Sequence, residues 1–177
     1  MIETFIYSLK ELCKYLPYIY TLLFFLNIAV HKKMSSLSIT LILVACAEFI
    51  IDSITSSPLM ALNDPSVEVI IRLSTWLLFW CYFYALCVFL LEKSHVWLNV
   101  SKSRTLVITE SVFAVLIALE LLHFTMAYFF QNSHLVSIYH FGVPIIRLSM
   151  GVYLLSQFLL SIKDHYVSRT HTPSGAT

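Results

Sequence analysis

Five long apolar runs follow one another along the chain, and a short polar break closes each of them. The runs cover residues 16–30, 37–57, 68–91, 106–130 and 137–162. A helix needs about 20 apolar residues to cross the hydrocarbon core of a bilayer, so each run is long enough, although the first is only just so. Lipid cannot hydrogen-bond backbone groups, and the runs lack the alternating pattern of barrel strands. We therefore expect each run to form a transmembrane helix.

The composition points to an integral membrane protein. Only 12% of the residues are charged and 59% are hydrophobic, with a mean hydropathy of +0.82, whereas a soluble domain has about 25% charged residues. Eleven Lys and Arg against ten Asp and Glu leave a net charge of +1, and no basic stripe is present to bind phosphates. These values exclude a soluble enzyme, a disordered tail and a nucleic-acid-binding protein. They predict one all-α integral membrane domain over residues 1–177.

The segment before the first run, residues 1–15, has an amphipathic pattern. Its apolar residues recur at helical spacing, with charged residues such as Lys10 and Lys14 between them. This pattern predicts a helix that lies in the membrane interface and ends before Pro17. The expected architecture is a helical bundle of about five spans behind this interfacial helix. If residues 16–30 re-enter the membrane instead of crossing it, the chain has four spans.

The basic residues lie on alternate sides of the predicted spans. Seven of the 11 Lys and Arg fall in residues 31–36, 92–105 and 163–177, whereas residues 58–67 and 131–136 contain none. The positive-inside rule makes the basic side cytoplasmic. The sequence therefore predicts a multi-pass protein of the plasma (inner) membrane, with its C-terminus in the cytoplasm and its N-terminus outside.

The cytoplasmic side offers the surface on which a partner protein could act. We expect the loop 92–105 to be exposed and the tail 163–177 to be exposed and flexible. The residues predicted to face a cytoplasmic partner are Lys93, His95, Trp97, Lys102, Arg104 and Lys163. The other predicted partners are the lipid bilayer and further copies of the chain.

Seven ionisable side chains fall inside the predicted spans, in the half of the membrane away from the basic side. They are Glu48, Asp52, Arg72, Glu120, His123, His140 and Arg147. A charge at the centre of a span costs about 2.5–3.5 kcal/mol on insertion scales, so such groups persist only when they are paired or hydrated. We expect Glu48 and Asp52 to pair with Arg72. We expect Glu120 to pair with Arg147, although the opposite pairing across the helix hairpins fits the sequence equally well.

Two interpretations of this intramembrane cluster remain open. The cluster is either a set of ion pairs that fixes helix register or a polar pocket for an ion, a proton or a small anion. The aromatic residues of the third run, 76–84, are interpreted as helix packing. A short motif surrounds both arginines, because residues 70–74 and 145–149 both read Ile-Ile-Arg-Leu-Ser. A duplicated two-helix hairpin would explain this repeat, and chance matching of apolar residues is the alternative.

Metal and haem sites have weak support in the sequence. Glu120 and His123 have the E-x-x-H spacing of di-iron helices, but a second such motif is absent, so no metal is predicted. His123 and His140 lie near the same membrane surface on successive helices, which is one way to hold haem b. The chain has only 3 glycines, which argues against the close helix packing that haem needs. We expect no cofactor, and haem b is the alternative.

The loops contain no nucleophile–base pair, phosphate-binding loop or metal quartet, so the protein is predicted not to be an enzyme. The leading hypothesis is an oligomeric inner-membrane protein that senses a membrane or envelope event and signals to a cytoplasmic partner. The membrane component of an exclusion, immunity or phage-defence pair is one example. The first alternative is an oligomeric ion channel or small transporter that uses the intramembrane cluster. The second is a haem b electron-transfer subunit.

Overall fold

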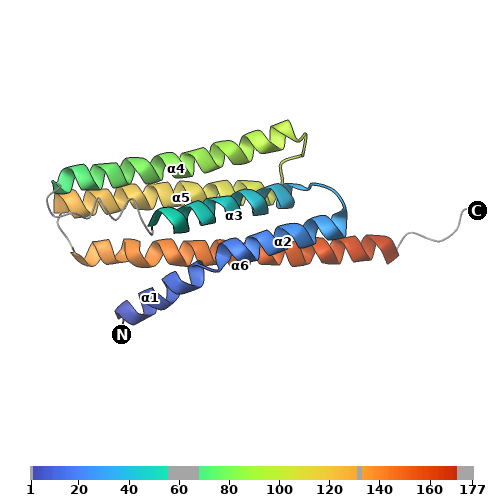
Figure 1. The fold of residues 1–177 in the computed structure, drawn as a ribbon, viewed down its shortest axis with the longest axis horizontal. Helices are drawn as coiled ribbons and strands as arrows, with labels where there is room; N and C mark the ends of the chain where they lie inside the picture. Colours follow the sequence, from blue (N-terminus) through green and yellow to red (C-terminus); the bar gives the residue numbers. More distant parts are fainter. Residues whose placement is uncertain (1, 56–67, 131–132, 171–177) are drawn as a thin grey trace, which may run out of the picture.

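The computed structural model of the protein describes residues 2–55, 68–130 and 133–170, and every regular element in these ranges is a helix (Figure 1). The elements are α1 (Ile2–Cys13), α2 (Leu16–His31), α3 (Ser36–Thr55), α4 (Val69–Trp97), α5 (Arg104–Thr125), the π-helix η2 (Met126–Phe130) and α6 (Ser133–Thr170). The predicted all-α class is confirmed for the described residues.

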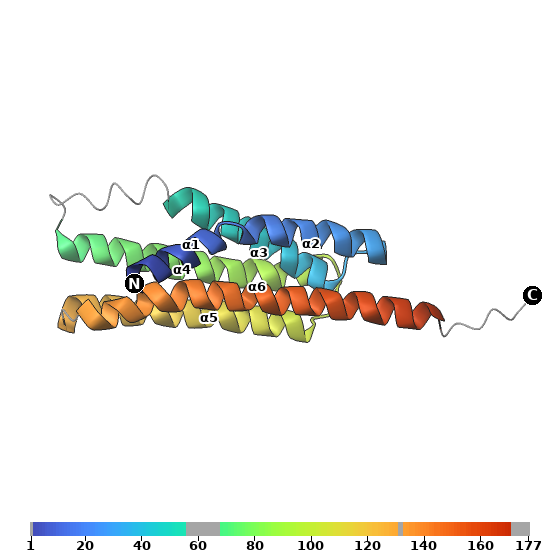
Figure 2. The same cartoon turned by 90° about the horizontal axis from the view of Figure 1, so that it is seen from below.

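The helices α2 to α6 lie side by side along one axis and alternate in direction (Figures 1 and 2). Helix α2 packs against α3 and α6, and α5 packs against α4 and α6. The loops 32–35 and 98–103 and the last turns of α6 consequently meet at one end of the bundle, which we call the basic end. The first turn of α4 and the π-helix η2 lie at the opposite end.

Five stretches of helix are long and apolar enough to cross a membrane, as the sequence predicts. They are Thr4–His31, Ser36–Ile54, Val69–Trp97, Arg104–Phe129 and Ile138–Val167. Large apolar side chains on their outer faces, such as Leu78, Tyr82 and Val152, are exposed. A soluble protein rarely exposes contiguous apolar surface on this scale, so the outer face suits contact with lipid.

The first of these stretches is broken between α1 and α2. Pro17 lies in the first turn of α2, and it lacks the N–H that a continuous helix would need at that position. Helix α1 therefore leaves the axis of α2 (Figure 1) and packs against α6, where the rings of Phe5 and Phe141 are 6.2 Å apart. The predicted end of the N-terminal helix before Pro17 is confirmed, but this helix contacts the bundle as well.

Several helices continue beyond the predicted spans, because a helix backbone satisfies its own hydrogen bonds in water as well as in lipid. Helix α6 runs to Thr170, so the expectation of a flexible tail from residue 163 is wrong for residues 163–170. Helix α4 runs to Trp97 and α5 begins at Arg104, so the predicted loop 92–105 shortens to residues 98–103. Residues 58–67, 131–132 and 171–177, for which loops and a tail were predicted, lie outside the described residues.

Helices α2 and α6 approach closely at Gly151. A Cβ atom at this position would lie 2.8 Å from Leu16 Cδ2 and 3.2 Å from the Tyr20 hydroxyl. Both neighbours are buried and belong to the hydrophobic core. The glycine therefore allows the two helices to pack at this distance.

Replacing Gly151 by alanine is expected to destabilise the bundle by about 1–3 kcal/mol, because the added methyl group overpacks the α2–α6 contact. The matched control is Gly142→Ala, where the new Cβ would meet Leu119 at an ordinary 3.4 Å. Thermal unfolding in detergent compares the two variants. If Gly142→Ala lowers the melting temperature as much as Gly151→Ala does, the close packing at Gly151 is not the cause.

Candidate functional site

A cavity of about 350 Å³ lies among α1, α3, α4, α5 and α6. Its volume falls in the range of about 300–1,000 Å³ that is usual for small-molecule sites. The residues around it are Lys10, Cys13, Lys14, Ile51, Asp52, Trp76, Trp80, Tyr84, Glu120, Tyr139, His140, Val143, Pro144 and Arg147. Four members of the predicted intramembrane cluster, from three helices, thus surround one cavity.

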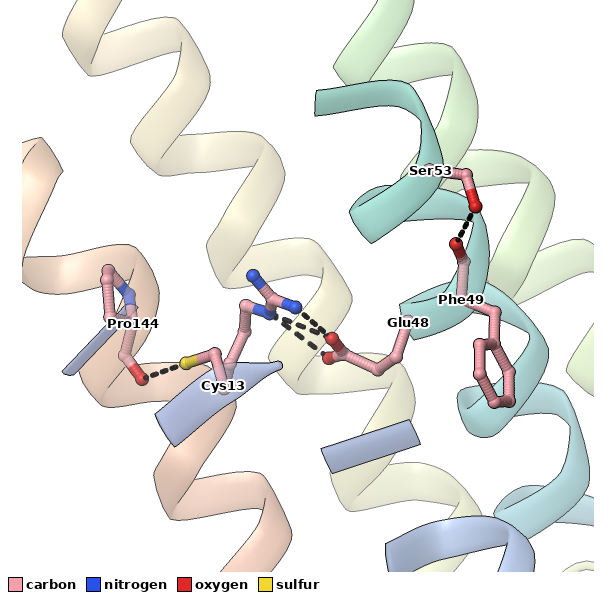
Figure 3. Close-up of polar contacts among 6 residues, drawn as sticks. Cys13, Glu48, Phe49, Ser53 and Pro144 are labelled. Carbon is pink, nitrogen blue, oxygen red and sulfur yellow. Dashed lines mark hydrogen bonds and ion pairs between the residues drawn. The ribbon is translucent and has the colours of Figure 1, made fainter. Parts of the chain in front are cut away.

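One wall of the cavity contains an ion pair between Arg147 of α6 and Glu48 of α3. Arg147 Nε donates to both carboxylate oxygens of Glu48, at 3.2 and 3.0 Å, and its Nη2 also contacts Glu48 Oε2. Figure 3 shows the Glu48 carboxylate, and dashed lines mark the contacts that it accepts. Glu48 is buried, so the pair meets the requirement that charges in an apolar interior neutralise each other.

This pairing corrects the preferred prediction, in which Arg147 pairs with Glu120 and Glu48 pairs with Arg72. The opposite pairing across hairpins, left open by the sequence, is the one that occurs for Glu48 and Arg147. Arg72 forms no ion pair with another described residue and does not line the cavity.

The two arginines differ because the repeated motif lies at two different depths. Arg72 follows the first residue of α4 by only three positions, or about 4.5 Å of helix. Arg147 lies in the interior of α6, about 21 Å from its first residue at a rise of 1.5 Å per residue. Both helices begin at the same end of the bundle (Figure 1), so the motif does not mark equivalent positions.

Glu120 of α5 is the second buried acidic residue at the cavity. Its side chain is 2% exposed, and Oε1 accepts a hydrogen bond of 2.7 Å from the Tyr139 hydroxyl. Oε2 is buried and has no hydrogen-bond partner among the described residues, and the same holds for the indole nitrogens of Trp76 and Trp80. Buried polar groups are rarely left without a partner, so each of these atoms needs an explanation.

Two histidines complete this side of the cluster. The rings of His123 and Tyr139 stack with centroids 4.1 Å apart, and the centroids of His123 and His140 are 6.2 Å apart. His140 lines the cavity and His123 lies behind Tyr139. In the part of the chain that the structure describes, no three His, Cys, Asp or Glu side chains are grouped as metal ligands would be.

Asp52, on the face of α3 one turn beyond Glu48, is half-buried at the cavity. Lys10 of α1 and Lys14, directly after the end of α1, line the same cavity and are exposed. Lys14 Nζ donates to Glu11 Oε1 at 2.7 Å. Helix α1 is therefore part of the cavity wall, a role that its amphipathic pattern does not reveal.

The basic end contains a second polar network, which involves His95. His95 is 1% exposed, so the prediction that it faces a partner is wrong. Its Nδ1 lies 2.8 Å from the Leu91 carbonyl, and its Nε2 lies 2.8 Å from Ser36 Oγ. Ser36 Oγ in turn lies 2.7 Å from Ser103 Oγ, which accepts from the Leu106 N–H at the start of α5.

The direction of the bonds in this network follows from its ends. A carbonyl only accepts, so Nδ1 of His95 donates to Leu91 and Nε2 accepts from Ser36 in the neutral ring. The hydrogen of the Ser36 hydroxyl is then donated to His95, so the Ser103 hydroxyl donates to Ser36 Oγ. The network joins the ends of α3, α4 and α5, and the hydroxyls that complete it could not be identified from charge patterning.

The other predicted partner-facing residues, Lys93, Trp97, Lys102, Arg104 and Lys163, are exposed. Lys102 pairs with Glu92, which links the loop 98–103 to the last turns of α4. This hydrogen bond raises the pKa of the Lys102 ammonium above its ordinary value. The basic end therefore keeps an exposed cationic surface around a buried hydrogen-bond network.

Comparison of the chain with protein-family models, with curated protein sequences and with solved structures finds no match.

Proposed function

We propose that the protein is a non-enzymatic membrane sensor that binds a small ligand in its cavity and changes the basic end in response. The basic end lies on the cytoplasmic side by the positive-inside rule, so the cavity lies in the outer half of the membrane. The observation that carries the proposal is the cavity itself, where the buried Glu120 carboxyl has an oxygen without a partner among the described residues. A bound ligand would supply that partner.

Two continuous helices connect the cavity to the basic end. Helix α6 contributes Tyr139 and Arg147 to the cavity and continues to Thr170. Helix α4 contributes Trp76 and Trp80 and continues to His95, which belongs to the network at the basic end. A shift of either helix at the cavity would therefore also move the residues of that helix at the basic end.

Conduction by a single chain has less support than sensing. Between the cavity and the basic end, the core consists of fully buried apolar side chains such as Leu41, Leu116 and Leu154. The hydrogens of the buried Thr40 and Thr109 hydroxyls are already donated to carbonyls of their own helices. A haem site is not proposed, because the His123 ring is already stacked on Tyr139.

A cavity-filling variant tests the proposed function. Val143 lines the cavity, and Val143→Trp is expected to displace any ligand that the protein retains when it is purified from native membranes into nanodiscs. Mass spectrometry of the retained small molecules and hydrogen exchange at residues 98–103 are measured on the same samples. The variant should lose a retained compound and change amide exchange at residues 98–103 by about tenfold, equivalent to about 1.4 kcal/mol of local opening free energy.

The matched control is Val152→Trp, on the exposed face of the same helix. It should keep both the retained compound and the wild-type exchange rate. If Val143→Trp loses the compound while amide exchange at residues 98–103 is unchanged, the cavity binds a ligand but does not signal. This result would contradict the proposed sensor. Identical results for the two variants would contradict ligand binding in the cavity.

A further inference from the structure

We propose that the cavity binds an organic monocation, an amine whose ammonium group donates a hydrogen bond to Glu120. This inference rests on the proposed function and names the ligand class of the same cavity. Three features of the cavity wall support it, namely the buried carboxyl of Glu120, the aromatic side chains around it and the balance of charge.

The carboxyl of Glu120 has one oxygen available to a ligand. Oε1 is used by Tyr139, whereas Oε2 is buried without a partner in the described part of the chain. A carboxylate oxygen only accepts hydrogen bonds, so the group that satisfies Oε2 must be a donor. A neutral hydrocarbon or an anion in the cavity would leave this oxygen unpaired, and an ammonium group gives the strongest bond because both partners are charged.

Aromatic side chains form the apolar part of the wall. Trp76, Trp80 and Tyr84 of α4 line the cavity, and the rings of Trp76 and Trp80 pack edge to face with centroids 5.8 Å apart. Ring faces of Trp and Tyr attract ammonium groups through their quadrupoles, and Trp is the strongest of the side chains in this respect. The spacing of this aromatic stripe alone predicts helix packing, whereas in the structure part of the stripe lines the cavity.

The indole N–H groups of Trp76 and Trp80 indicate a second functional group on the ligand. The N–H groups of Trp76 and Trp80 are buried and have no acceptor among the described residues. Trp76 lies near Glu120, but no hydrogen bond of ordinary distance and angle joins its N–H to the carboxyl. An indole N–H only donates, so the ligand needs an oxygen acceptor, such as a hydroxyl or carbonyl, beside its ammonium group.

The charges at the cavity favour a ligand with one positive charge. Arg147 is neutralised by Glu48, and Lys14 is neutralised by Glu11. The lining also contains Lys10, Asp52 and Glu120. Ionised, these three sum to a net charge of −1, which a monocation would balance.

Fluorescence of the cavity tryptophans tests this ligand class. Trp76 and Trp80 line the cavity, and the third tryptophan, Trp97, lies at the other end of α4, so a Trp97→Phe background leaves the emission from the cavity alone. The probe is 2-amino-1-phenylethanol, which has a hydroxyl beside its ammonium group, titrated into the purified full chain in nanodiscs. Its neutral alcohol analogue 1-phenylethane-1,2-diol and the anion 3-hydroxy-3-phenylpropanoate are titrated in parallel. Saturable binding of the amine, about tenfold or more tighter than either analogue, is expected.

Glu120→Gln separates binding in the cavity from partition of the amine into lipid. Glutamine keeps an acceptor for Tyr139 but presents an amide in place of Oε2, so amine affinity should fall about tenfold or more. The matched control is Glu92→Gln at the basic end, which should bind as the wild type does. If Glu120→Gln does not fold, Glu120→Asp retains the charge and should retain the preference for the amine over the alcohol.

Two results would overturn this inference. One is equal binding of amine and alcohol, and the other is amine binding that survives unchanged in a folded Glu120→Gln variant. If the amine shows no preference while Val143→Trp still loses a retained compound, the ligand class is wrong and the proposed function stands. If Val143→Trp loses nothing either, both proposals fail.

Discussion

Replacing Arg147 by alanine is expected to destabilise the bundle by about 3–5 kcal/mol, the usual cost of removing one partner from a buried ion pair. The variant leaves the Glu48 carboxyl, which is 2% exposed, without the guanidinium that donates to both of its oxygens. It also removes the contact between α3 and α6 at the cavity wall. Reversible unfolding in mixed micelles, followed by circular dichroism, measures the change in free energy.

The double variant Glu48→Leu/Arg147→Met is the control for this prediction. It removes both charges together, so we expect it to be more stable than Arg147→Ala, since a buried pair can often be replaced by apolar residues at little cost. Arg72→Ala is a second control, because Arg72 has no ion-pair partner among the described residues and should cost much less. If Arg72→Ala destabilises the protein as much as Arg147→Ala, the pairing in the structure is incorrect.

Replacing Leu154 by alanine is expected to cost about 2–5 kcal/mol, because a cavity remains where the side chain was packed. Leu154 has no exposed surface and belongs to the core of the bundle. The neighbouring Leu155 is 41% exposed on the outer face of α6. Leu155→Ala should cost less than about 0.5 kcal/mol, since substitutions outside the core are usually within that range.

The comparison of these two neighbours tests the rotation of α6 about its axis. Both variants remove the same atoms from the same helix turn, so differences in helix propensity cancel. Thermal unfolding in detergent and in nanodiscs should give the same ranking. Equal destabilisation by Leu154→Ala and Leu155→Ala would show that α6 faces the bundle through a different side.

Much of the fold could be predicted because hydropathy and charge report on position along each helix. The number of long apolar helices and the break before Pro17 follow from the sequence. The segments 31–36, 92–105 and 163–170, which contain seven of the 11 Lys and Arg, lie at one end of the bundle as expected (Figure 1). The predicted spans stop at residues 91 and 162, whereas α4 ends at Trp97 and α6 ends at Thr170. The prediction is too short because hydropathy falls at the first charged residue while the backbone hydrogen bonds continue.

The sequence could predict which residues belong to the candidate site, but not how these residues pair. Depth along a helix indicates that Glu48, Glu120 and Arg147 lie in one region, but the partner of each depends on helix rotation and on which helices are neighbours. Pairing within the predicted hairpins was therefore the wrong choice for Arg147, which reaches across to α3. The sequence does not indicate that α1 contributes to the cavity. A helix on a free surface would show the same amphipathic spacing of charged residues, Lys10 included.

The ion pair also has a consequence for biosynthesis. Glu48 is translated 99 residues before Arg147, so α3 is synthesised well before the last helix is complete. A nascent chain that stops short of α6 therefore carries an unmatched acidic group in its third helix. This acidic group is neutralised only when α6 supplies Arg147, so a full-length chain contains the ion pair and an interrupted chain does not.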